Sequence, residues 1–128
     1  MARRHVVTSG APHPLGPYSQ GVLAGQWLYC AGQMGLDPAT GELVDGAVSE
    51  QATRALLNIK AVLEAAGANL SAVVNTTLIL ANIGDFAAVN EVYGRFFVEA
   101  PPARSVIGGV SLPRGALVEI VAIACLNE

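Results

Sequence analysis

The chain has 128 residues, of which 52% are hydrophobic and only 13% charged, and its formal net charge is −3. This length suits one domain, residues 1–128, and is too short for two. The few basic residues are scattered, which argues against nucleic acid as a partner. No apolar run reaches the roughly 18 residues of a membrane-spanning helix.

The location of the protein follows from its N-terminus and its cysteines. No apolar segment follows Arg3 and Arg4, so the N-terminus is not a secretory signal. Cys30 and Cys125 each lie within an apolar strand pattern. We interpret them as buried thiols of a cytoplasmic protein, with a disulfide or a reactive thiol as the alternative.

Three strands are predicted in the first quarter of the chain, from β-branched and aromatic residues bounded by turns. They cover residues 4–8, 18–23 and 27–31. A tight turn at residues 23–26 makes a hairpin of the last two. A further turn at residues 37–41 contains Pro38 and Gly41.

Two later segments have helical periodicity. The first is capped by Ser49 and stopped by Gly67, and its apolar face consists of Ala52, Leu56, Ile59, Leu63 and Ala66. The second is capped by Asp85 and carries Phe86, Val89, Tyr93, Phe96 and Phe97 before Pro101 and Pro102. We interpret these aromatic side chains as core and not as a platform for a ligand.

The remaining strands are predicted at residues 73–81, 103–108 and 116–126. The order is therefore three strands, helix, strand, helix and two strands. It predicts an α+β fold in which both helices pack on one face of a mixed six-stranded sheet. Because charged residues are scarce, we expect copies of the chain to cover the other face.

Arg104 and Glu119 are charged residues inside otherwise apolar strands. Such placement is costly unless the charge is paired, hydrogen-bonded or next to a wet cavity. A guanidinium can hold a carboxylate, and a Glu can transfer protons. The alternative is a structural ion pair between the two strands. Glu119 lies on one side of a strand that is apolar on both sides, which puts it near the expected boundary between copies.

Six motifs occur in series along nearly the whole chain. They are Gly16-Pro17-Tyr18-Ser19-Gln20, Ala31-Gly32-Gln33, residues 37–42, residues 58–67, Pro102-Ala103-Arg104-Ser105 and residues 118–124. Together they resemble the RidA (YjgF) family of reactive-intermediate deaminases. The resemblance implies a chorismate-mutase-like homotrimer with three sites at the subunit interfaces. It also implies hydrolysis of 2-imino acids or their enamines, such as 2-iminopropanoate and 2-iminobutanoate, to 2-oxo acids and ammonia, without metal or cofactor.

The resemblance also assigns residues. Arg104 matches the family's carboxylate-binding Arg, Glu119 its water-positioning Glu, and Tyr18 a Tyr at the site mouth. Gly32 matches a loop whose backbone meets the ligand, and Asn90 matches a further site position. An alternative for Tyr18 is that it ties down a loop.

Two positions depart from the family pattern. Ala31 stands where many members have Ser, and Val106 where many have Cys. The first change removes a possible hydrogen bond, and the second makes the pocket wall branched and apolar, so both bear on substrate preference. Two other functions stay open: a non-catalytic trimer that binds small carboxylates or regulates a partner, and the RNA cleavage or translation inhibition attributed to some members.

Overall fold

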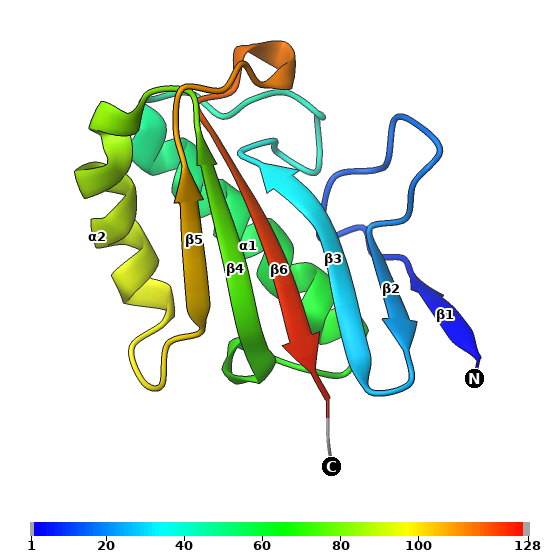
Figure 1. Cartoon of the computed structure of the whole chain (residues 1–128). Coiled ribbons are helices and arrows are strands. Elements are labelled where there is room, and N and C mark those ends of the chain that lie inside the picture. Colours follow the sequence, from blue (N-terminus) through cyan, green and yellow to red (C-terminus); the bar gives the residue numbers. More distant parts are fainter. Residues whose placement is uncertain (1, 127–128) are drawn as a thin grey trace.

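The computed structural model describes residues 2–126 and consists of one sheet with two helices behind it (Figure 1). The strands are β1 (Arg3–Val6), β2 (Gly21–Ala24), β3 (Trp27–Met34), β4 (Val73–Leu80), β5 (Ala103–Ile107) and β6 (Val118–Cys125). The helices are α1 (Val48–Ala65) and α2 (Phe86–Phe96), and 3₁₀ turns lie at Leu70–Ala72, Ile83–Asp85 and Pro113–Gly115. The predicted element order and the α+β class are confirmed.

The sheet has the strand order β1-β2-β3-β6-β4-β5. Neighbouring strands are antiparallel except β4 and β5, which are parallel and joined through α2. Parallel neighbours need such a crossover connection. In this order β6, the last strand of the chain, lies between β3 and β4, and β5 forms an edge. The predicted mixed six-stranded sheet is confirmed.

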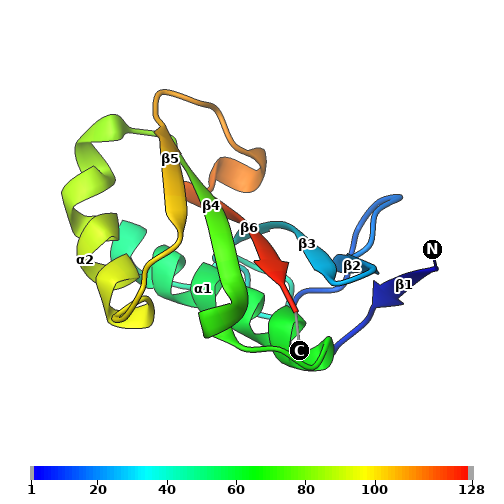
Figure 2. The same ribbon diagram turned by 60° about the horizontal axis from the view of Figure 1, so that its bottom comes forward.

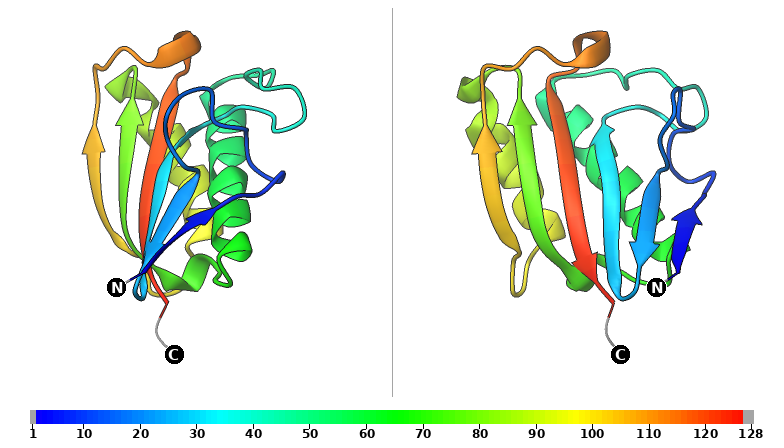
Figure 3. Two further views of the ribbon diagram at one scale, coloured as in Figure 1. Left: turned by 90° about the vertical axis from the view of Figure 1, so that its right-hand side faces the viewer. Right: turned by 45° about the vertical axis from the view of Figure 1, so that its right-hand side comes forward.

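Both helices cover the same face of the sheet, as Figures 2 and 3 show from three directions. On β6 the side chains that face the helices are almost completely buried, and they are Val118, Ile120, Ala122 and Ala124. The predicted α1 face also lies in this core, with each of its five residues buried. Alternation along the strands thus separates a helix-covered face from a second face.

The second face, which we call the open face, has no covering layer within residues 2–126 (Figure 3). It nevertheless carries large apolar side chains: Trp27, Tyr29 and Ile107 are 42%, 52% and 48% exposed. Large exposed apolar side chains on an uncovered sheet face are typical of an interaction surface. The expectation that copies of the chain cover the face stays a prediction.

The start of α1 differs from the prediction that Ser49 is its N-cap. The helix begins one residue before Ser49, and the cap position is Ala47. Ala47 has no side chain that can cap the first turn; instead Oε1 of Glu50 accepts the backbone N–H of Ala47 at 2.8 Å and so ties the cap residue to the first turn of the helix. Asp85 does occupy the cap position of α2, but its side chain makes no capping hydrogen bond.

The strand predicted at residues 18–23 begins only at Gly21. The segment before it is held as a loop by Gln20, whose buried amide bonds both backbone groups of Thr8 and the carbonyls of Ala11 and Pro12. A side chain that satisfies so many backbone groups stabilises a loop conformation where a strand ladder would have formed. Tyr18 therefore lies in this loop.

The cysteines form no disulfide: both are free thiols, Cys30 buried and Cys125 partly buried. Burial raises the pKa of the Cys30 thiol to about 12, so this thiol stays neutral and unreactive at physiological pH. No helix within residues 2–126 has both the length and the apolar character needed to cross a membrane.

Candidate functional site

Arg104 lies on the edge strand β5, and its side chain packs against α2. It pairs in register with the buried Thr76 on β4, so it leaves the sheet on the helix side. Its guanidinium carbon lies 5.2 Å from the ring centre of Phe86 and 4.9 Å from that of Tyr93. Its Nη1 also donates a hydrogen bond of 2.8 Å to Oδ1 of Asn90. One helix therefore holds the guanidinium by two cation–π contacts and one hydrogen bond.

The spacing of α2 explains this arrangement. Residues 86, 90 and 93 recur at intervals of four and three, so their side chains share one face of the helix. Tyr93 is fixed in turn by Thr76, whose hydroxyl lies 2.6 Å from the Tyr93 hydroxyl in the core. Burial raises the pKa of Tyr93, so its hydroxyl stays protonated. We call Arg104, Phe86, Asn90, Tyr93 and the neighbouring Val106 the arginine group.

Within residues 2–126 no carboxylate pairs with Arg104. The one ion pair found there joins Arg95 and Glu91, 3.9 Å apart on the surface of α2. The guanidinium is exposed and keeps donors free for a ligand, since Asn90 occupies only one of its nitrogens. The alternative of a structural ion pair between Arg104 and Glu119 is therefore wrong.

Glu119 lies on β6, on the open face, next to a bulge in β3. The register between β3 and β6 shifts between Cys30 and Gln33, which places Ala31 and Gly32 in the bulge. A side chain at Gly32 would overlap Oε2 of Glu119 and lie 3.0 Å from its Cδ. The absent side chain of Gly32 thus makes room for the carboxyl group. We call Glu119, Gly32, Ala31 and Tyr18 the glutamate group.

The carboxyl group of Glu119 is half-buried, and this burial raises its pKa above the ordinary value. A carboxylate with a raised pKa is a stronger base than one in water. The proton is also held more tightly in the folded than in the unfolded protein. The protonated form therefore stabilises the fold at low pH, and this contribution is lost as the pH rises through the raised pKa.

We expect Glu119→Gln to raise the melting temperature at pH 7–8, because Gln keeps the shape of the protonated acid without its desolvated charge. The gain should shrink as the pH falls toward 4.5, the ordinary pKa of a glutamate side chain, because Glu119 then becomes protonated itself. Calorimetry across this pH range measures the effect. Glu64→Gln, at an exposed position of α1, is the matched control. An equal gain at all pH values would contradict the role of charge burial.

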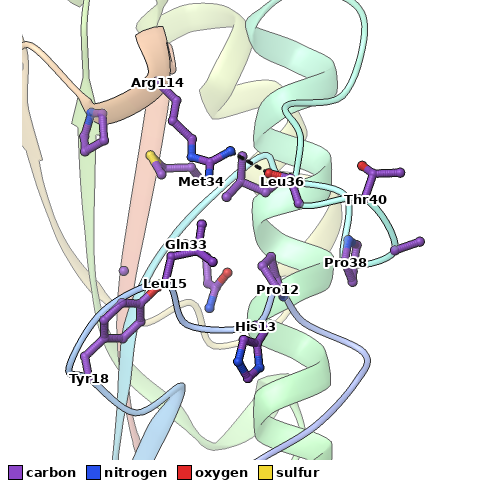
Figure 4. Close-up of a pocket in the computed structure, with 14 residues that line it drawn as sticks. Pro12, His13, Leu15, Tyr18, Gln33, Met34, Leu36, Pro38, Thr40 and Arg114 are labelled. Atoms are coloured by element: carbon purple, nitrogen blue, oxygen red, sulfur yellow. Dashed lines mark hydrogen bonds between the residues drawn. The ribbon is translucent and has the colours of Figure 1, made fainter.

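Tyr18 lies at the wall of a cleft of about 460 Å³ (Figure 4). The cleft is formed by the loop at residues 12–18, by the end of β3 with the loop that follows it as far as Gly41, and by the turn around Arg114. Gly32 also lines it, so the cleft opens beside the glutamate group. Tyr18 is 55% exposed and its side chain makes no hydrogen bond within residues 2–126, so the structure does not support the alternative that it ties down a loop.

The arginine and glutamate groups do not meet within one copy of the chain. Arg104 is level with Ala122 of β6, three residues from Glu119, and two strand spacings separate β5 from β6. These offsets put the two Cα atoms about 14 Å apart. The side chains also leave the sheet on opposite faces. The sequence prediction assigned both residues to one site at the boundary between copies. A single copy provides the arginine group on one face of the sheet and the glutamate group on the other, so it contains only the two separate halves of such a site.

Sequence reasoning missed Phe86 and Tyr93 as members of the candidate site, because both were interpreted as core. That interpretation is correct for Tyr93, which is buried, but its ring also holds Arg104. The shared helix face with Asn90 is a signal that could have found them. Within residues 2–126, no cluster of three or more His, Cys, Asp or Glu side chains is placed to bind a metal ion.

Comparison with known proteins identifies the family of this chain. Residues 8–126 match the family described as Endoribonuclease L-PSP. The chain belongs to the RidA (YjgF, L-PSP) family. Among its RidA relatives, Protein DfrA of Myxococcus xanthus is 52% identical, with 97% of this chain and 96% of the relative covered. The 2-iminobutanoate/2-iminopropanoate deaminase of Capra hircus is 48% identical, with 97% and 90% covered.

Solved RidA structures share the fold. RidA of the Antarctic bacterium Psychrobacter sp. PAMC 21119 has a TM-score of 0.92 at 41% identity, over 96% of this chain and 99% of that one. Escherichia coli TdcF, solved with bound serine, has a TM-score of 0.93 at 36% identity, over 97% and 99%. The fold expected for a RidA protein is thus confirmed.

Proposed function

We propose that this protein hydrolyses 2-imino acids to 2-oxo acids and ammonia, at sites where Arg104 of one copy meets Glu119 of another. The observation that carries the proposal is the division of the site. An anion-binding group that has no carboxylate partner among residues 2–126 lies on one face of the sheet, and a basic carboxyl group lies on the other. A relative of similar length is named for this reaction, and another was solved with an amino acid bound.

Arg104 would bind the carboxylate of the imino acid with two parallel charge-assisted hydrogen bonds. Phe86, Tyr93 and Asn90 fix the guanidinium in advance, so little freedom is lost when the substrate binds. This orients one face of the C=N bond toward the neighbouring copy. Positioning of this kind contributes directly to the rate.

Glu119 would then act as general base. Its carboxylate takes a proton from a water molecule, whose oxygen forms a bond to the imine carbon. The π electrons of the C=N bond move to the nitrogen, which receives this first proton, and the product is a carbinolamine. Glu119 then takes the remaining proton of the new hydroxyl group and passes it to the nitrogen as the C–N bond breaks, so ammonia and the 2-oxo acid leave. General acid–base help of this kind contributes about 10²–10⁴-fold, which suits a substrate that already hydrolyses in water. Each atom of imine and water is accounted for in the two products.

The assembly in this proposal is the homotrimer that the family resemblance implies. The apolar open face supplies the surface for it, because Trp27, Tyr29 and Ile107 are left exposed in a single copy. In a closed ring of three, each copy presents one group to the next copy and receives the other from the previous one. Three equivalent sites follow.

A direct assay tests the function. An amino-acid oxidase with catalase generates 2-iminopropanoate and 2-iminobutanoate, and semicarbazide traps the imine that remains. We expect wild-type protein to lower the trapped fraction, and Arg104→Ala and Glu119→Gln each to lose about 10²-fold or more of this activity. If wild-type protein never speeds imine loss, the proposed function fails. Binding of 2-oxobutanoate without turnover would then favour a carboxylate-binding protein, and cleavage of RNA the activity in the family's description.

A further inference from the structure

The cleft beside the glutamate group is larger than the smallest imino acids require. Its volume of about 460 Å³ falls within the range of roughly 300–1,000 Å³ that encloses drug-sized ligands. Its walls include the apolar side chains of Leu15, Met34 and Leu36. Gly32 connects it to Glu119, since Gly32 lines the cleft and the carboxyl group of Glu119 occupies the space where a side chain at Gly32 would lie. A substrate at Glu119 can therefore extend its side chain into this space.

Arg114 lies at the far end of the cleft from Tyr18 (Figure 4). It belongs to the turn Pro113–Gly115 and has a φ of +62°, a left-handed conformation that is costly for a side chain other than Gly or Asn. Its Nη1 donates a hydrogen bond of 2.7 Å to the carbonyl oxygen of Gly41 on the opposite wall. The guanidinium is thus held at the cleft by both its backbone and its contact across it.

The charge of Arg114 is not neutralised within residues 2–126. Among the described residues, no Asp or Glu lines the cleft and no carboxylate lies within ion-pair distance of this guanidinium. In the described part of the chain, the only other Arg, Lys or His side chain in the cleft lining is that of His13. Gly41 occupies one nitrogen of the guanidinium, and the remaining donors are available to an anion. The cleft therefore combines walls that are only partly apolar, since Gln33 and Thr40 also line it, with one fixed positive charge at its end.

From this geometry we propose that the cleft binds the side chain of the substrate and that Arg114 binds a carboxylate at the end of that side chain. Preferred substrates are then 2-imino dicarboxylic acids, with Arg104 holding the carboxylate next to the imine and Arg114 the distal one. The inference rests on the proposed function, because it concerns the same site. It makes Arg114 a specificity-determining residue.

The test compares imines made by amino-acid oxidases from alanine and from glutamate, with kcat/KM measured for each. Arg114→Asn removes the charge and suits the left-handed backbone, and Arg114→Lys keeps the charge. We expect Arg114→Asn to lower the ratio of kcat/KM for the glutamate imine to that for the alanine imine by about 10- to 100-fold. Arg114→Lys should retain part of the preference. Arg95→Gln, on the surface of α2, should change neither value.

The outcomes separate the two proposals. Wild-type protein that hydrolyses neither imine contradicts the proposed function. A wild type that hydrolyses the alanine imine but disfavours the glutamate imine, or an unchanged ratio in Arg114→Asn, overturns the role of Arg114 alone. Calorimetric titration with 2-oxoglutarate and 2-oxobutanoate gives a second measurement that needs no turnover. Arg114→Asn should selectively weaken binding of 2-oxoglutarate, and equal weakening for both ligands would count against a distal carboxylate site.

Discussion

Mixing Arg104→Ala with Glu119→Gln should restore activity that neither variant has alone. If a site takes its Arg from one copy and its Glu from the next, random exchange in an equal mixture gives about one quarter of the sites both native residues. The two groups leave the sheet on opposite faces, about 14 Å apart at the Cα atoms, so one copy cannot assemble such a site by itself. Imine loss is measured after subunit exchange in mild denaturant and its removal.

The control is an equal mixture of wild type with the double variant Arg104→Ala, Glu119→Gln. Before exchange this mixture has half of the wild-type activity, and after exchange about one quarter if the site is shared between copies. A fall to that level proves that the subunits have exchanged. If tagged and untagged copies co-purify after the treatment, which shows exchange independently, but the activity stays at half and the two single variants remain inactive together, both residues act within the same copy and the proposed interface is wrong.

The division of the site could be foreseen only in part from the sequence. Alternation along a strand shows that Val118 and Glu119 lie on opposite faces. Whether Arg104 shares the face of Glu119 depends on the register of β5 on β4 and of β4 on β6, and no local pattern specifies either. The parallel pairing of β4 and β5 follows from the α2 crossover, but its register is set by packing between distant segments.

Elements with strong local signals were predicted well. The buried face of α1 was predicted residue by residue because five apolar residues recur at helical spacing and Gly67, with a φ of +89°, ends the helix. Signals that depend on a single side chain were less reliable. Ser49 has a good capping residue type, but the helix already begins at Val48 and the cap position is held by Ala47, which has no capping side chain. The local pattern predicts that Tyr18 lies in a strand, but in the structure the buried Gln20 holds its segment as a loop.

The candidate site shows the same limit. The motifs pointed to Arg104 and Glu119, but the contacts that prepare each of them come from other elements. Arg104 is held by rings that the sequence places in the core, and Glu119 has room because β3 carries a bulge at Ala31 and Gly32. A bulge has no simple signature beyond a Gly within a strand. Such contacts become visible only in the folded chain.

The bulge leads to the second prediction of large effect: Gly32→Ala should abolish most activity while leaving the fold intact. An Ala side chain there would lie 3.0 Å from Cδ and 3.2 Å from Cγ of Glu119, so the carboxyl group must move. The clash involves the far end of a flexible side chain, so the unfolding free energy should fall by only about 1 kcal/mol. Loss of a positioned general base costs about 10²–10⁴-fold in rate.

Gly94→Ala is the matched control, because a side chain at this position of α2 meets nothing within 4 Å. It should keep full activity.

Mixing of variants shows whether Gly32 acts through the arginine group or the glutamate group. Gly32→Ala should regain activity with Arg104→Ala, since the damage then lies in different groups of the shared site, and should regain none with Glu119→Gln. Recovery in the second mixture would show that Gly32 acts independently of Glu119. Normal activity of Gly32→Ala alone would show that the reaction does not depend on the position of the Glu119 carboxyl group.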